Sequence, residues 1–175
     1  MTSRPGKSLV VFVEGPDDER FVKFVVTPLV LNTYDQVIIK KYANEKKGTI
    51  KQYVKAFRKN NMFDYYFTRD MDAETCVEKR KKSLKFGQDE SKVIIVCREI
   101  ESWYLAGLDQ SQCKTLRVTH HRNTESVSKE QFDKLIPPRT ASRTAFLIQV
   151  LTRFSLKAAK SQNTSFRYFA GKLNI

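Results

Sequence analysis

The sequence predicts an α/β fold: a mainly parallel four-stranded sheet with flanking helices, followed by a C-terminal helical extension. Four short apolar, β-branched segments alternate with stretches of helical periodicity over about the first 110 of the 175 residues. Near-continuous apolar strands that alternate with helices are typical of a parallel sheet covered on both faces. We therefore expect an α/β domain over residues 1–110 and a basic, mostly helical extension over residues 111–175 packed on it.

Each element has its own signal along the chain. The strands are expected at residues 8–13, 36–40, 64–68 and 92–96. Acidic residues in a first turn predict a helix over residues 17–26, which Pro28 should end. Apolar residues recur at i, i+3, i+4 and i+7 from Ile50 to Phe57, the pattern of an amphipathic helix. Further helices are expected at residues 73–84, 99–108, 142–160 and 166–173, with an irregular stretch over residues 110–140.

The charge is strongly positive and unevenly distributed. The chain has 32 Lys and Arg against 19 Asp and Glu, a net charge of +13, and no acidic residue follows Asp133. A second basic block covers residues 79–82. Charge of this kind indicates an anionic partner, which could be nucleic acid, a ribosome or an anionic membrane surface. The alternative is that the basic residues simply lie on solvent-exposed helix faces and bind nothing. As nucleic-acid-binding residues we predict two basic sets: Lys79, Arg80 and Lys82 of the block, and a stripe of Arg153, Lys157 and Lys160 on the helix at 142–160.

The same composition argues against several classes of protein. The apolar runs are short and broken, which excludes a membrane span, and the polar residues 1–7 do not look like a signal peptide. The uneven charge around acidic strand ends favours nucleic acid over a membrane as the partner. Three cysteines without a CxxC pair do not form a disulfide framework or a zinc ribbon. We therefore expect a reduced, cytoplasmic protein.

Carboxylates follow three of the four predicted strands. Glu14 comes directly after the first, Asp70 and Asp72 follow the third, and Glu99 and Glu101 follow the fourth. Ligands of parallel α/β sheets bind beyond the carboxyl ends of the strands. On an extended segment Asp70 and Asp72 would point the same way and reach one cation together. Oxygen ligands favour Mg²⁺ or Mn²⁺. In phosphodiester cleavage these ions stabilise the attacking oxygen and the leaving oxygen. The structural alternative is that Asp70 caps the next helix and Glu14 is an ordinary loop residue.

These motifs resemble the TOPRIM family. Leu9–Phe21, with Glu14-Gly15-Pro16-Asp17-Asp18, is similar to its first strand and glutamate, and Phe67–Asp72 is similar to its DxD element. The pattern resembles most the compact TOPRIM nuclease of the OLD family, and Cys97–Leu105 and Ser165–Phe169 resemble small stand-alone TOPRIM-like proteins encoded beside ATPases. The fold implied is TOPRIM or Rossmann-like.

The resemblance implies a Mg²⁺- or Mn²⁺-dependent endonuclease acting on DNA or RNA. It implies Glu14, Asp18, Asp70 and Asp72 as metal ligands, with Glu14 also a candidate general base. It further suggests a separately encoded ATPase partner, a homodimer and a role in anti-phage defence. Glu101 is our candidate for an additional catalytic carboxylate, because its apolar neighbours place it at the edge of a buried face, where a carboxylate either has a raised pKa or needs a cation.

Two other kinds of function remain to be weighed. A DxD also occurs in haloacid-dehalogenase phosphatases and in glycosyltransferases. The phosphatase motif follows the first strand, whereas here it follows the third, and a glycosyltransferase would explain neither Glu14-Gly15 nor the basic tail. The second alternative is a catalytically inactive TOPRIM-like module that binds nucleic acid or an ATPase. Clustered carboxylates argue against it, since without a cation they destabilise one another.

Overall fold

The computed structural model describes residues 6–175. Residues 1–5, and with them most of the segment that argued against a signal peptide, lie outside the described residues. The chain forms two compact units. The first contains the chain up to Arg69 together with Glu74–Ile95, and the second contains Asp70–Ala73 together with Val96–Ile175. The helix expected at residues 99–108 thus belongs to the second unit.

The predicted α/β fold and its sheet are confirmed. The strands are β1 (Ser8–Val13), β2 (Gln36–Lys41), β3 (Phe63–Asp70) and β4 (Val93–Val96). They lie in the order β2-β1-β3-β4, and β1 pairs in parallel with both β2 and β3. Every residue of β1 and β4 is buried, as their apolar sequences predicted.

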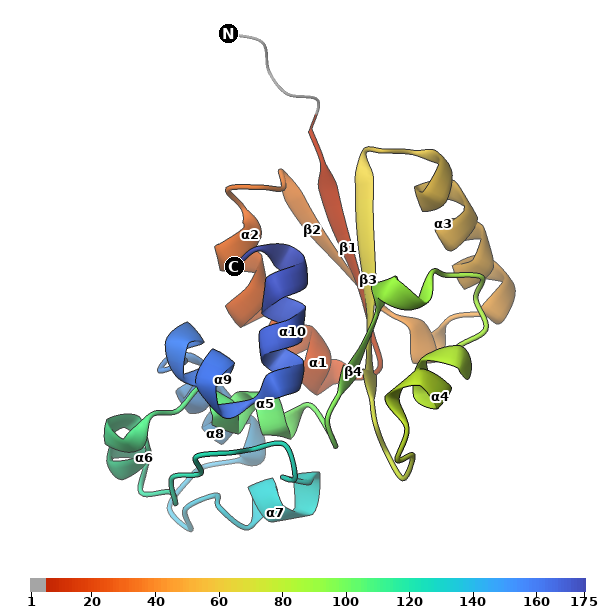
Figure 1. Cartoon of the computed structure of the whole chain (residues 1–175). Coiled ribbons are helices and arrows are strands. Elements are labelled where there is room, and N and C mark those ends of the chain that lie inside the picture. The colour runs from red at the N-terminus through yellow and green to blue at the C-terminus, as the bar shows by residue number, and fades with distance from the viewer. Residues whose placement is uncertain (1–5) are drawn as a thin grey trace, which may run out of the picture. The chain divides into compact units, whose positions relative to one another are not determined.

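The two connections that flank β1 cover opposite faces of the sheet. The chain runs from β1 through α1 (Pro16–Phe21) and α2 (Thr27–Val30) to β2, and from β2 through α3 (Lys47–Lys59) back to β3. The connection from β1 to β2 and the connection from β2 to β3 run in opposite directions across the sheet, so right-handed crossovers place their helices on opposite faces. Figure 1 shows α1 and α2 on one side of these strands and α3 on the other. The strand order therefore reverses between β1 and β3, which is the position where α/β sheets bind ligands.

Pro28 does not end the first helix, contrary to our expectation. A π-helical segment, Val22–Val26, joins α1 to α2, and the helical turn continues to Val30. Proline has no N–H and its ring crowds the preceding turn, so a helix that contains it must widen or bend. The π-helical turn supplies that widening: the backbone N–H of Thr27 bonds to the carbonyl of Val22.

The helix α3 is amphipathic, as its periodicity predicted. Ile50 and Val54 are buried, and Phe57 lies 6.3 Å from Phe12 of β1, measured between ring centroids. Phe12 in turn stacks on Phe67 of β3 at 4.4 Å. The first unit is completed by a short basic helix, α4 (Val77–Lys82), which covers only part of the predicted 73–84.

The second unit is helical and is built around one buried helix. Its helices are α5 (Glu101–Ala106), α6 (Gln110–Leu116), α7 (Lys129–Asp133), α8 (Arg143–Leu151), α9 (Leu156–Gln162) and α10 (Thr164–Leu173). All six residues of α5 are buried. Trp103 of α5 stacks on Phe169 at 5.3 Å and donates a hydrogen bond from its indole nitrogen to Ser165 Oγ at 2.8 Å. The aromatic residues of the tail thus pack α10 onto α5.

Two expectations about this unit were wrong. Residues 110–140 contain α6 and α7, each opened by a reciprocal capping box, from Asp109 and Ser128 respectively. The single helix expected at 142–160 is interrupted after Leu151. The reason is a close approach at Gly107: a Cβ there would lie 2.0 Å from the ring of Phe154, and the Gly107 carbonyl accepts a hydrogen bond from Ser155 N. This contact holds the chain in a turn between α8 and α9.

Among the described residues, no helix is both long and apolar enough to cross a bilayer.

Candidate functional site at the strand ends

Glu14, the residue after β1, is held by two side chains of the first unit. The hydroxyl of Tyr42 donates a hydrogen bond to Glu14 Oε1 at 2.7 Å. The Nε of Arg69, on β3, lies 3.7 Å from the same oxygen. Burial, together with the neighbouring Glu14 carboxylate, raises the pKa of Tyr42 far above its ordinary value, so the phenol remains a hydrogen-bond donor. Glu14 is thus an oriented, partly compensated carboxylate.

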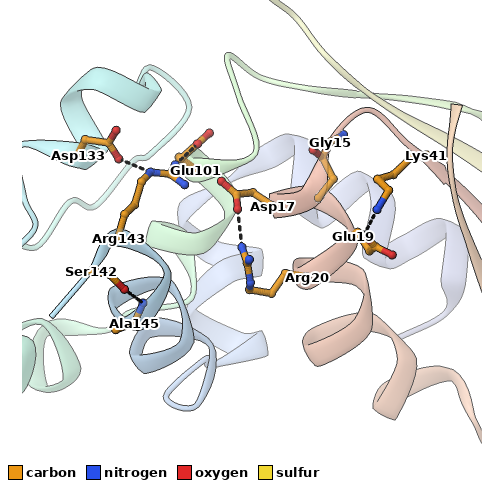
Figure 2. A network of polar contacts seen from close by, with 11 residues as sticks. Gly15, Asp17, Glu19, Arg20, Lys41, Glu101, Asp133, Ser142, Arg143 and Ala145 are labelled. Carbon is orange, nitrogen blue, oxygen red and sulfur yellow. Dashed lines mark hydrogen bonds and ion pairs between the residues drawn. The ribbon is translucent and has the colours of Figure 1, made fainter. Parts of the chain in front are cut away.

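Asp18 is 4% exposed and lies in the first turn of α1. Its Oδ2 accepts a hydrogen bond from the backbone N–H of Gly15 at 3.2 Å, which gives it a capping role at the start of this helix. The adjacent acidic residues are paired within the first unit, Asp17 with Arg20 and Glu19 with Lys41, as Figure 2 shows. The acidic first turn predicted from the sequence is therefore present.

Asp70 and Asp72 belong to the second unit, and the extended segment expected for them is wrong. The strand ends at Asp70, and Asp72 has a left-handed backbone with φ +51°. Between them the N–H of Met71 bonds to the carbonyl of Val96 at 2.9 Å and to that of Arg98 at 3.1 Å, which turns the chain out of the strand. Aspartate tolerates this conformation better than most residues. The two carboxylates consequently do not share the i, i+2 face of a strand.

Asp72 borders a small cavity of about 210 Å³ in the second unit. Its other lining residues include Arg98, Glu99, Ser128 and Glu130. Glu99 accepts a hydrogen bond from the backbone N–H of Lys129 at 2.5 Å. The cavity thus combines several carboxylates with one guanidinium.

Glu101 is 3% exposed, and its compensating cation is an arginine of the chain itself. Arg143, the first residue of α8, lies 2.5 Å through its Nη2 from Glu101 Oε1 and 2.7 Å through its Nε from Asp133 Oδ1. Figure 2 shows the guanidinium of Arg143 between the two carboxylates. Of the two possibilities predicted for a carboxylate at this position, a raised pKa or a cation, the structure has the cation, and Arg143 supplies it within the second unit.

The donor chemistry of the predicted metal ligands suits a hard divalent cation, because carboxylate oxygens are the ligands that Mg²⁺ and Mn²⁺ prefer. Among residues 6–175, however, no group of three or more His, Cys, Asp or Glu side chains is arranged to hold one ion. Glu14 and Asp18 belong to one unit and Asp70 and Asp72 to the other.

The predicted nucleic-acid-binding residues lie on three elements. Lys79, Arg80 and Lys82 are on α4, where Lys79 is 3.1 Å from Glu74. The continuous stripe expected in the C-terminal region is wrong, because Arg153 lies in the turn between α8 and α9 while Lys157 and Lys160 are on α9.

Sequence reasoning missed the partners that orient the carboxylates. Tyr42, Arg69 and Arg143 each contact a predicted site residue, at sequence separations of 28, 55 and 42 residues. Arg69 could have been noticed, because it adjoins Asp70. In the parallel register of β1 with β3, Phe12 pairs with Phe67, and two residues further along each segment Arg69 is level with Glu14. Nothing local distinguishes Arg143 from the other basic residues of the acid-free tail.

Comparison with known proteins adds one structural likeness. No family model matches the chain, and no curated protein matches it significantly. A solved structure, the C-terminal region of the Burkholderia pseudomallei OLD protein, matches over 95% of each chain with 14% sequence identity and a TM-score of 0.42.

Proposed function

We propose that this protein is a divalent-metal-dependent nuclease that cleaves phosphodiester bonds in DNA or RNA. The observation that carries the proposal is the position of two acidic motifs relative to the sheet. Glu14 follows β1 directly, Asp70 is the last residue of β3, and these parallel neighbours flank the point where the strand order reverses. The motif resemblance described above supports the same activity.

In this proposal Glu14 and Asp18 of the first unit and Asp70 and Asp72 of the second are the candidate ligands of Mg²⁺ or Mn²⁺ that the resemblance implies. The bound ion would supply Lewis-acid stabilisation of charge on phosphodiester oxygens. Tyr42 and Arg69 position Glu14 through the contacts already described. The exposed lysines and arginines of the chain would attract and retain the phosphate backbone.

The test is a cleavage assay on plasmid DNA, single-stranded DNA and tRNA, with Mg²⁺, with Mn²⁺ and with EDTA. We expect metal-dependent nicking or cleavage by the wild type and its loss in Glu14→Gln and in Asp70→Asn with Asp72→Asn. Glu45→Gln is a matched control, because it removes one exposed carboxylate outside the proposed ligand set. Adding Glu101→Gln to the series tests the predicted catalytic role of Glu101. Since the resemblance implies an ATPase partner, the assay is run with and without a candidate partner ATPase.

A binding experiment separates the metal from the chemistry. A ligand that binds only the folded protein raises its melting temperature. We expect millimolar Mg²⁺ or Mn²⁺ to do so for the wild type and not for Asp70→Ala with Asp72→Ala. An unchanged wild-type melting temperature would contradict the metal site.

A specific observation also favours the alternative, a catalytically inactive binding module. Among the described residues no three His, Cys, Asp or Glu side chains are arranged to hold one ion, and Glu101 and Glu14 already have cationic or hydrogen-bonding neighbours within the chain. If metal binds and nucleic acid binds but no substrate is cleaved with or without the partner, the binding module is the correct reading.

A further inference from the structure

A basic groove lies in the first unit, and none of the residues that line it is one that sequence analysis assigned to nucleic acid. It is a cavity of about 710 Å³ between the outer side of α3 and residues 85–87. Five cationic side chains line it: Lys51, Lys55, Arg58, Lys59 and Lys85. No acidic residue is among the lining residues, and none occurs in α3.

The floor of this groove is apolar and rigid. Val54 is 1% exposed, and Phe86 packs on the core, with its ring 5.8 Å from Phe67 and 5.9 Å from Tyr42 between centroids. Arg58 donates a hydrogen bond through Nη1 to the carbonyl of Gly87 at 3.1 Å and so connects the two walls. The groove is therefore built into the fold of this unit, and it combines a fixed floor with charged rims.

The charges of the groove are not neutralised within the described chain. Lys51, Lys55 and Lys59 repeat at i, i+4 and i+8 on one face of α3, and all three are exposed. Between residues 6 and 175 neither these lysines nor Lys85 makes an ion pair. Like charges lining one concave surface focus a positive potential and raise the local concentration of anions.

We propose that this α3 groove binds a nucleic-acid strand through its phosphates. From Lys51 to Lys59 the helix rises about 12 Å, at about 1.5 Å per residue. At about 3.4 Å of axis per phosphate on each strand, that length faces three to four consecutive phosphates. The half-buried Phe86 offers a base or sugar the apolar surface that nucleic-acid grooves commonly provide beside their cations.

Other anions fit the groove less well. A single small anion needs one or two cations, whereas five are spread along this groove. An anionic membrane is best met by an amphipathic helix that presents apolar side chains outward. The apolar residues of α3, Ile50 and Val54, instead face the core. The inference rests on the proposed function for the class of ligand, but it requires neither metal nor cleavage.

The experiment measures binding of fluorescent single-stranded DNA, single-stranded RNA and duplex DNA by anisotropy in EDTA, over a series of salt concentrations. The test variant carries Lys51→Gln, Lys55→Gln, Lys59→Gln and Lys85→Gln. The control variant carries glutamine at four other exposed lysines, Lys23, Lys114, Lys129 and Lys134. Each variant loses four of the +13 charges, so a general charge effect cannot distinguish them.

We expect the test variant to bind at least about tenfold more weakly than the control at about 0.1 M salt. Its slope of log affinity against log salt should also be smaller by about 3, since each phosphate contact contributes about 0.7 for single strands. The three oligonucleotides show which form of the phosphate backbone the groove prefers. Binding by the test variant within twofold of the control, with unchanged salt dependence, would overturn the proposal.

Two further results separate this inference from the proposed function. Groove-dependent binding without cleavage by any form of the protein supports the groove and contradicts the nuclease. Anionic phosphatidylserine vesicles serve as the competing surface. If replacing the four groove lysines reduces sedimentation of the protein with vesicles but does not reduce its binding of oligonucleotides, the groove is a membrane site and the proposal is wrong.

Discussion

Replacing Arg143 with methionine should destabilise the protein strongly, because it leaves a buried carboxylate without its cation. Glu101 has a side chain 4% exposed and Arg143 one 29% exposed, with 2.5 Å between Nη2 and Oε1. Removing one partner of a fully buried pair costs about 3–5 kcal/mol. Since Arg143 is partly exposed, we expect a loss of about 2–4 kcal/mol in the free energy of unfolding.

The expected loss can be measured by urea denaturation and by melting. For a chain of this length about 1 kcal/mol shifts the melting temperature by 2–4 °C, so a decrease of about 5–15 °C is expected. Asp133→Asn is the matched control: Asp133 is the other acceptor of Arg143, but its side chain is 38% exposed. Surface ion pairs contribute about 0–1 kcal/mol, so the control should lose no more than that.

A double-mutant cycle isolates the pair itself. Glu101→Leu combined with Arg143→Met replaces both charges by apolar groups, which is often neutral for buried ion pairs. The double variant should therefore recover at least about 1 kcal/mol relative to the sum of the single variants. Losses that add within about 0.5 kcal/mol, or an Arg143→Met variant no less stable than Asp133→Asn, would refute the reasoning.

Three other predictions test the packing and electrostatics of each unit. Gly107→Ala should cost about 1–3 kcal/mol or more, because its Cβ would overlap the ring of Phe154, and thermal unfolding measures the loss. Asn163→Ala should cost about 2–4 kcal/mol in urea denaturation, since it removes the cap of α10 and the partner of buried Thr124. Burial alone would raise the pKa of Asp64, but hydrogen bonds from a lysine and a tyrosine hold it below its ordinary value. Its stabilising contribution is therefore complete above about pH 4 and is lost as the pH falls through the lowered pKa, so Asp64→Asn should flatten the acid side of the stability profile.

The predictions for Gly107 and Asn163 each have a control in the same unit, and the prediction for Asp64 has an outcome that would contradict it. Gly171→Ala, at a site where an added Cβ meets nothing within 4 Å, should not reproduce the loss at Gly107. Asn174→Ala changes an exposed asparagine beyond α10 and should cost less than Asn163→Ala. If Asp64→Asn leaves the profile between pH 3 and pH 7 unchanged, the ion pair and hydrogen bond to Asp64, from Lys7 and Tyr34, do not stabilise the folded state.

The elements that the sequence predicted well are those with strong local signals. The buried strands β1 and β4 follow from short continuous apolar runs, and the amphipathic helix α3 follows from apolar residues at a period of about 3.6. One error occurred where a distant residue overrides the local pattern. The helix expected at 142–160 is broken by the approach of Phe154 to Gly107, a contact 47 residues apart.

The sequence alone determined that this chain forms a parallel α/β sheet with carboxylates after its strands and a large excess of positive charge. It also predicted that Glu101 lies at the edge of a buried face, where a carboxylate has a raised pKa or needs a cation. Only the tertiary structure decided that the cation is Arg143, that Tyr42 and Arg69 hold Glu14, and that the lysines of α3 line one groove. The physical reason is that periodicity reports which side of an element is buried. Which charges meet across elements depends on contacts between residues that are far apart in the chain.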